Sequence, residues 1–247
     1  RALYNMPHEY TYGGHVYFKG ADVLHTLRGY LGDSLFFLGL NSFFNAYPFT
    51  DVNSGKMRDH LTAATGYDLT DFFNGWVFNG GWPHFSVDSV NPSFVGPGNY
   101  SVAVHLKQKL TGAPAIFNNV PLEITFWDSS WTRYTERRTI TGFTGIETFN
   151  LNAPPLLTVI DYNEKISDAI TSETRIIKST GTYAVGGITS GNGIKFTLAV
   201  TSIADSLLIR VEHNWTSPDP IAVPTIYHLN PYRYWKVMGI FPNAWSP

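Results

Sequence analysis

The chain has 247 residues, of which 43% are hydrophobic and 15% charged, and its formal net charge is −2. This share of apolar residues can build hydrophobic cores, so the composition excludes a disordered chain. The near-neutral charge argues against a nucleic-acid-binding protein. The longest apolar runs, such as Leu35-Phe36-Phe37-Leu38, are far shorter than the roughly 18 residues of a membrane span. The sequence therefore predicts no membrane span.

Cysteine is absent, which excludes disulfides, thiolate metal ligands and a cysteine nucleophile. The chain begins with Arg1 rather than methionine, and no signal-peptide pattern follows. We therefore expect a processed product or a piece of a longer protein.

Up to about residue 80 the apolar residues follow a helical spacing. Six of them recur at intervals of three or four residues: Tyr17, Ala21, Leu24, Leu27, Tyr30 and Leu31. This spacing predicts one apolar helix face. The helix should end at Gly32, and a second, Phe-rich helix should end before Pro48. A third helix is predicted over residues 53–64, closed by Gly66, and a short fourth one after the capping residue Asp68. Together they predict a packed helical layer.

From about residue 84 onward the pattern has a period of two. Apolar residues alternate with polar or small ones over residues 101–107 and 122–127, as in antiparallel strands with one solvated face. Turn signals separate the strand patterns, which predicts a β-sandwich over residues 84–163. Further strand patterns predict a second β unit over residues 164–247. Its apolar closing segment, residues 240–247, predicts that this unit is incomplete.

The eight histidines do not form a recognisable metal-binding motif. His8-Glu9 begins like the zinc motif H-E-x-x-H, but Tyr12 stands where the second histidine should be. The remaining histidines are scattered over separate predicted elements. The sequence predicts no zinc site within these residues, and it contains no nucleophile elbow, P-loop or dinucleotide fingerprint.

One segment resembles a known family. Tyr17-Phe18-Lys19-Gly20-Ala21, then Leu31-Gly32, Thr65-Gly66-Tyr67-Asp68-Leu69 and Trp76-Val77 closely resemble the M1 family of zinc aminopeptidases, also called gluzincins. The resemblance implies a multidomain α+β fold. Residues 1–82 would be the helical C-terminal half of a thermolysin-like catalytic domain, followed by the β-sandwich and the second β unit. The tail at residues 232–240 resembles exported M1-type peptidases of Bacteroidetes-like bacteria, which implies a secreted or periplasmic protein.

The resemblance assigns one site residue. Tyr17 falls on the tyrosine of the family motif Y-[E/D]-K-G, whose phenol donates a hydrogen bond to the oxyanion formed when zinc-bound water attacks a peptide carbonyl. The implied cofactor of the intact parent is zinc, and the implied substrate is a peptide. Phe18 departs from the motif, which has an acid at this position. We expect Lys19 to be structural.

The family's zinc ligands and general base precede this tyrosine, and only 16 residues precede Tyr17 here. We therefore expect a fragment of a metallopeptidase (a hydrolase) that holds no metal or cofactor and is inactive alone. Its helical layer should expose an apolar surface, through which the fragment could self-associate. Two alternatives stay open. One is a non-catalytic binding or structural module on an M1-like scaffold, and the other is a sugar-binding β module with an exposed aromatic strip at Tyr232, Tyr234 and Trp235.

Overall fold

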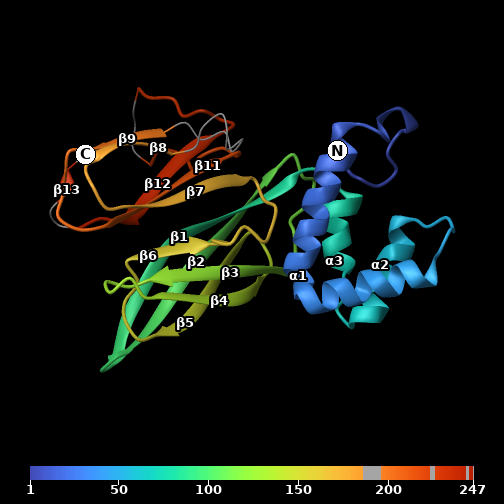
Figure 1. Ribbon diagram of the computed structural model, residues 1–247, viewed down its shortest axis with the longest axis horizontal. Helices are drawn as coiled ribbons and strands as arrows, with labels where there is room; N and C mark the ends of the chain where they lie inside the picture. Colours follow the sequence, from blue (N-terminus) through green and yellow to red (C-terminus); the bar gives the residue numbers. More distant parts are fainter. Residues whose placement is uncertain (186–195, 223–225, 243–244, 247) are drawn as a thin grey trace. The chain divides into compact units, whose positions relative to one another are not determined.

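Figure 1 shows the chain as a computed structural model, which describes residues 1–185, 196–222, 226–242 and 245–246. Helices come first and antiparallel sheets follow, so the predicted α+β class is confirmed at this level. The chain divides into two compact units. Unit 1 comprises Arg1–Thr125, Arg133–Pro154 and Thr158–Asp168, and unit 2 comprises Phe126–Thr132, Pro155–Leu157 and Ala169–Pro247.

The helical elements of unit 1 break where the sequence predicts. They are η1 His8–Tyr10, α1 Gly14–Ala46, α2 Ser54–Thr65, α3 Thr70–Phe72 and the π-helical η2 Phe73–Phe78. Inside α1, Gly32 has φ 71° and interrupts the helix, so α1 consists of two segments. Gly66 closes α2 at φ 69° in the left-handed region, which glycine enters without steric cost. Asp68 accepts a hydrogen bond from the backbone N–H of Thr70 at the start of α3.

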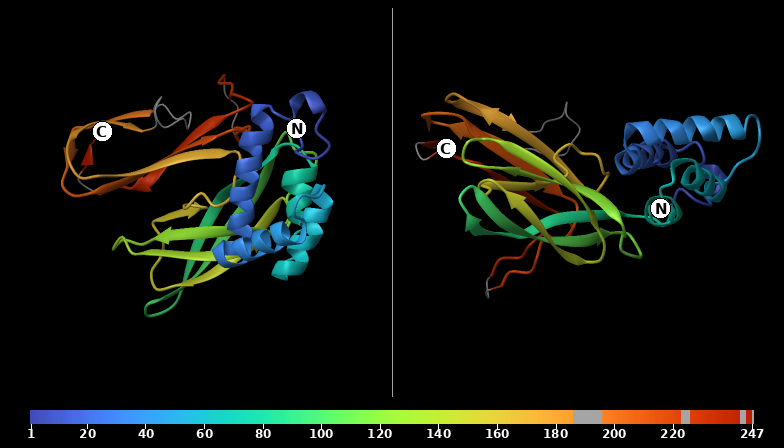
Figure 2. Two further views of the ribbon diagram at one scale, coloured as in Figure 1. Left: turned by 45° about the vertical axis from the view of Figure 1, so that its right-hand side comes forward. Right: turned by 90° about the horizontal axis from the view of Figure 1, so that it is seen from below.

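Aromatic residues form the core of the helical layer. Leu61, Leu69 and Trp76 are fully buried. The ring of Tyr30 meets that of Trp76 edge to face at 5.4 Å, and Trp76 meets Phe117 at 4.5 Å. Such edge-to-face pairs add to the stability gained from area burial. Figures 1 and 2 show these helices beside one end of the strands of unit 1. None of the helices in the described residues is long and apolar enough to span a membrane.

Two three-stranded sheets follow the helices. The strands are β1 Trp82–Gly96, β2 Asn99–Thr111, β3 Val120–Trp127, β4 Arg133–Ile140, β5 Thr144–Leu151 and β6 Leu157–Ile160. Their orders are β1-β2-β5 and β4-β3-β6, and β2 is antiparallel to both of its neighbours. On β2 the predicted apolar residues Val102, Val104 and Leu106 are all buried. The period of two therefore identified the inward face of this strand correctly.

Unit 2 contains a third antiparallel sheet, of order β12-β11-β7. Its strands and the shorter ones beside it in sequence are β7 Ile170–Ile177, β8 Gly181–Val185, β9 Phe196–Val200, β10 Ser202–Ile203, β11 Leu207–Asn214, β12 Tyr234–Ile240 and β13 Trp245–Ser246. Leu207, Ile209 and Val211 on β11 pack in one cluster with Val185 of β8 and with Leu198 and Val200 of β9. The prediction that this unit is incomplete rests on residues 240–247, which lie partly outside the described residues.

Candidate functional site

Tyr17 lies in the first turns of α1, on a solvent-exposed face of the helix. Its side chain is 59% exposed. Ala21 and Leu24, one and two turns further on, are exposed as well. The sequence predicts that these three residues share a packed face with Leu27 and Tyr30, and this prediction is wrong. They form instead an exposed stripe that begins with Tyr17.

A different stripe of α1 is buried: the loop that follows β6 packs on part of it, and Trp76 packs against Tyr30. The buried residues of the first helix segment are Lys19, Val23, Thr26, Leu27, Tyr30 and Leu31. At Gly29 an added Cβ would lie closer than 3.0 Å to the backbone oxygen of Lys165 and 3.2 Å from the Ile166 side chain. Glycine is thus required at this helix position by the close approach of residues 161–168, which we call the cradle loop.

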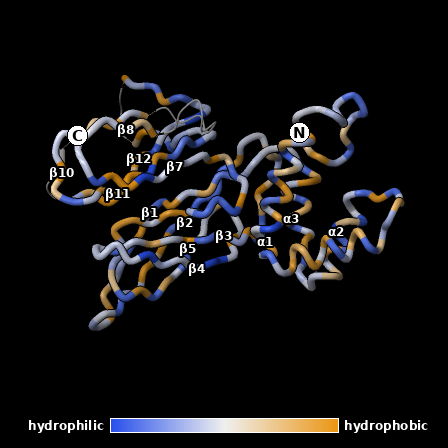
Figure 3. The backbone as a smooth tube through the Cα atoms, viewed as in Figure 1, coloured by the Kyte–Doolittle hydropathy of each residue, from blue (hydrophilic) through white to orange (hydrophobic). Residues whose placement is uncertain are grey.

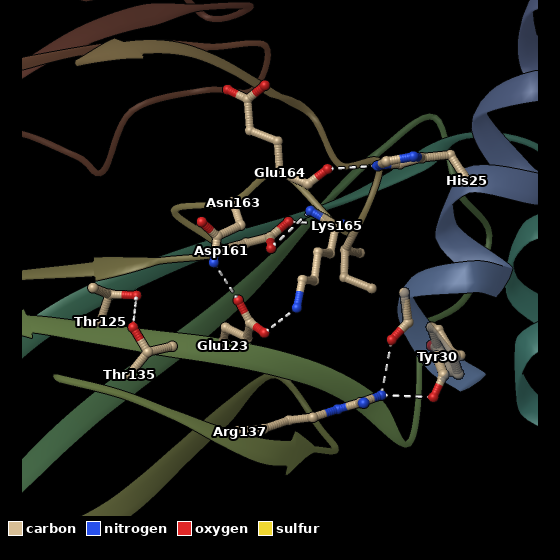
Figure 4. A network of polar contacts seen from close by, with 12 residues as sticks. His25, Tyr30, Glu123, Thr125, Thr135, Arg137, Asp161, Asn163, Glu164 and Lys165 are labelled. Atoms are coloured by element: carbon tan, nitrogen blue, oxygen red, sulfur yellow. Dashed lines mark hydrogen bonds and ion pairs between the residues drawn. The ribbon is translucent and has the colours of Figure 1, made fainter. Parts of the chain in front are cut away.

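Four hydrogen bonds join the cradle loop to the helical layer. The backbone N–H of Ser167 donates to Thr26 Oγ1 at 3.0 Å, and the Ser167 hydroxyl donates to the Asp22 carbonyl at 3.2 Å. His25 Nε2 lies 2.7 Å from the Glu164 carbonyl (Figure 4). Trp76 Nε1 donates to the Ser167 carbonyl at 3.3 Å. Each of these bonds joins a side chain to a backbone group, and three of them hold the helix segment that carries Tyr17.

Arg137 on β4 contacts the same helix segment at its other end. Nη2 of Arg137 donates to the carbonyls of Gly29 and Tyr30, at 3.0 and 2.7 Å (Figure 4). The last carbonyls of a helix have no partner within it. Because Gly32 interrupts α1 directly after these residues, a cation here meets the negative end of the helix dipole.

A polar network fixes the cradle loop to β3 (Figure 4). Glu123 accepts hydrogen bonds from Asn163 at 2.8 Å and from Lys165 at 2.5 Å. Burial opposes ionisation of Glu123, but the bonds from Lys165 and Asn163 outweigh it and lower its pKa. Asp161 accepts from the backbone N–H groups of Lys165 and Ile166. Burial nevertheless raises the pKa of Asp161.

Phe18 and Lys19, which follow Tyr17 in the chain, have opposite environments. Phe18 is 76% exposed, whereas Lys19 is buried. The Lys19 ammonium donates to the carbonyl of Arg1 at 2.9 Å and lies 4.9 Å from the ring centroid of Trp82. Burial lowers the pKa of Lys19. These contacts attach the N-terminal segment to α1.

The described residues do not fit a zinc site. They contain no group of three or more His, Asp or Glu side chains close enough together to hold a metal ion. His8 and Glu9 lie in the short exposed element η1. We therefore derive no chemical step through a metal from these residues.

Sequence reasoning missed Arg137 and the cradle loop. Nothing in the local pattern of β4 marks Arg137, because the carbonyls that it contacts lie more than a hundred residues earlier in the chain. The glycine at position 29, within a helical pattern, is the one sequence signal of a close backbone approach.

One of the comparisons with known proteins concerns the helical segment that carries Tyr17. Residues 5–76 match the family profile described as the peptidase family M1 domain. This segment, which we call the M1 segment, belongs to the M1 family. Aminopeptidase N of Lactococcus lactis subsp. lactis is 30% identical to this chain over 80 residues, which are 32% of this chain and 9% of the relative.

Two further comparisons cover more of the chain beyond the M1 segment. Aminopeptidase N of Lactococcus lactis strain IL1403 is 23% identical over 180 residues, which are 69% of this chain and 20% of the relative. The crystal structure of Legionella pneumophila aminopeptidase A in complex with aspartic acid covers 60% of this chain and 16% of its own, with a TM-score of 0.47 and 17% identity. The chain thus spans about a tenth to a fifth of the length of the curated relatives it matches.

Proposed function

We propose that residues 1–247 are the C-terminal portion of a zinc-dependent M1-like aminopeptidase, and that the rest of the parent supplies the metal ligands and the general base. Family membership of residues 5–76 and the small share of each relative that is matched support this proposal. The intact parent would remove N-terminal residues from peptides.

The observation that carries the proposal is the exposure of Tyr17 within the M1 segment. A phenol can donate a hydrogen bond to a developing oxyanion only if it projects from its own fold, and that of Tyr17 does. One preorganised donor of this kind lowers a barrier by about 3–4 kcal/mol. A tyrosine supplies the hydrogen bond while staying neutral, since its pKa is ordinarily about 10.

Exposed apolar side chains on both segments of α1 support a covering domain. Hydrophobic residues recur along both segments of α1 (Figure 3). Leu24 is 43% exposed, Phe37 50% and Phe44 65%. Clusters of exposed large apolar side chains are typical of surfaces that another protein part covers. We propose that the upstream half of the catalytic domain covers this side of α1, and that without it the chain self-associates there.

The remaining parts of the proposal concern organisation and location. Residues 1–82 would complete the catalytic domain, residues 84–163 would form the β-sandwich, and residues 164–247 would form a further β unit. Export of the parent to the periplasm or the medium, in a Bacteroidetes-like host, follows from the resemblance of the tail alone.

The experiment compares this chain with the parent protein that contains the upstream residues. We expect the 247-residue chain to bind no stoichiometric zinc by elemental analysis and to release no p-nitroaniline from amino-acid p-nitroanilides. The parent should do both. Stoichiometric zinc on the short chain, or a parent without zinc and activity, would refute the proposal.

Phe18 favours one alternative, a non-catalytic module on an M1-like scaffold, because it replaces the acid of the family motif. This alternative predicts that the sequence upstream of Arg1 lacks H-E-x-x-H and the third glutamate. Reading the upstream gene sequence decides between the two functions.

A further inference from the structure

We propose that Arg137 is a positioning residue for catalysis: from strand β4 it sets the direction of the helix segment that carries Tyr17. This inference rests on the proposed function of Tyr17. It goes beyond that function because it gives Arg137, a residue of a separate strand, a role in placing the phenol of Tyr17.

The contact of Arg137 is made at the point where α1 is interrupted. The first segment of α1 ends at Gly32, and a single guanidinium nitrogen of Arg137 holds the carbonyls of both Gly29 and Tyr30. Charge-assisted hydrogen bonds of this kind are about twice as strong as neutral ones. The end of the segment is thereby tied to β4.

The strand that bears Arg137 is itself fixed. Thr135, two residues earlier on the same face of β4, shares a hydrogen bond of 3.0 Å with Thr125 of β3 (Figure 4). On β3, two residues before Thr125, Glu123 binds Lys165 of the cradle loop. Arg137 and the cradle loop thus hold one helix segment from two elements that are joined through β3.

A small tilt of this helix segment displaces Tyr17. Loss of Arg137 releases the Tyr30 end, so the segment turns about the residues that still bind the cradle loop, Asp22 to Thr26. At 1.5 Å rise per residue, Tyr17 lies about 10 Å of helix from the middle of these residues, and a tilt of about 6° moves it by about 1 Å. A misplacement of about 1 Å in a catalytic group can lower a rate by about 100-fold.

The loss of Arg137 should leave the fold intact. Arg137 is exposed, so its truncation creates no core cavity, and the four hydrogen bonds between the cradle loop and the helical layer remain. The neighbouring Arg138 is the matched control. It lies on the opposite face of β4, where it pairs with Glu136 and, at 3.4 Å, with Glu147.

The test is made in the parent protein, with Arg137→Met, Arg137→Lys, Arg138→Met and Tyr17→Phe. We expect Arg137→Met to lower kcat about 10-fold or more at nearly unchanged KM, Arg137→Lys to restore part of the loss, and Arg138→Met to keep the original kcat. In the background of Tyr17→Phe, the further substitution Arg137→Met should not lower kcat again, because Arg137 acts through the phenol that is already absent.

A readout on the 247-residue chain tests the inference without catalysis. Arg137→Met should speed hydrogen exchange of amides in residues 14–31 while leaving those in residues 54–65 unchanged. Three results would each overturn the inference. Amides in residues 14–31 of Arg137→Met could exchange at the wild-type rate, or Arg137→Met and Arg138→Met could lower kcat equally. The third is that Arg137→Met lowers kcat by the same factor whether or not Tyr17→Phe is present. Failure of the proposed function would look different: Tyr17→Phe itself would keep full activity.

Discussion

Gly29 and Gly20 are both interior residues of α1, and replacing each with alanine should have opposite effects on stability. A Cβ at Gly20 would meet no atom within 4 Å. Alanine is favoured over glycine within a helix by about 0.5–1 kcal/mol. We therefore expect Gly20→Ala to stabilise the protein by this amount.

At Gly29 the same helix gain is outweighed by steric conflict. A Cβ there would lie 3.2 Å from the carbonyl carbon of Lys165 and still closer to its oxygen. Backbone atoms cannot rotate away, so the cradle loop must shift. Overpacking typically costs about 1–3 kcal/mol, and loss of one or two hydrogen bonds, such as that between Ser167 and Thr26, adds about 0.5–1.5 kcal/mol each. After subtraction of the helix gain, Gly29→Ala should destabilise unit 1 by about 2 kcal/mol.

Urea denaturation followed by circular dichroism at 222 nm measures this difference, because all the helices of the described residues belong to unit 1. With slopes of about 1–3 kcal/mol per molar urea, the two variants should differ in midpoint by about 1 M or more. Equal stabilisation by both substitutions would refute the contact between α1 and the cradle loop.

Three further predictions concern the core and the titrating groups. Leu61→Ala, at a fully buried site, should cost about 2–5 kcal/mol, while Leu38→Ala, at a site that is 53% exposed, should change stability by less than about 0.5 kcal/mol in the same urea assay. Because the native pKa of Glu123 lies below 4.5, its pairing with Lys165 stabilises the fold above that pH and is lost as the pH falls through the native pKa. Glu123→Gln should flatten the acid side of a stability–pH curve, and an unchanged curve would contradict this. Burial, aided by the charge of Arg233, lowers the pKa of His213, so wild-type stability should fall as the pH drops below 6.5. His213→Phe should remove this loss in a melting series from about pH 7.5 to about pH 5, and an unaltered decline would contradict it.

The breaks between elements could be predicted from the sequence because they depend on local chemistry. Gly32 and Gly66 adopt positive φ values, which other residues reach only with strain. The strand pattern around Val104 is equally local, because alternating residues of a strand point to the same face of the sheet. These features need no knowledge of distant residues.

The packed face of α1 could not be predicted in the same way. The helical spacing of Tyr17, Leu24 and Leu27 fits an apolar stripe, but spacing does not say where along the helix a partner covers that stripe. The cradle loop, whose Ser167 lies 141 residues beyond Thr26 in the chain, covers the side that bears Thr26 and Gly29. Tyr17 and Leu24 stay exposed as a result.

The central claim is that the phenol of Tyr17 stabilises the transition state of peptide hydrolysis in the parent enzyme. Steady-state kinetics of the parent with Tyr17→Phe tests it most directly, because the substitution removes one hydroxyl from an exposed residue and should leave the fold and KM nearly unchanged. We predict that kcat falls about 100- to 1,000-fold. A variant that turns over peptides as fast as the wild type would contradict the claim.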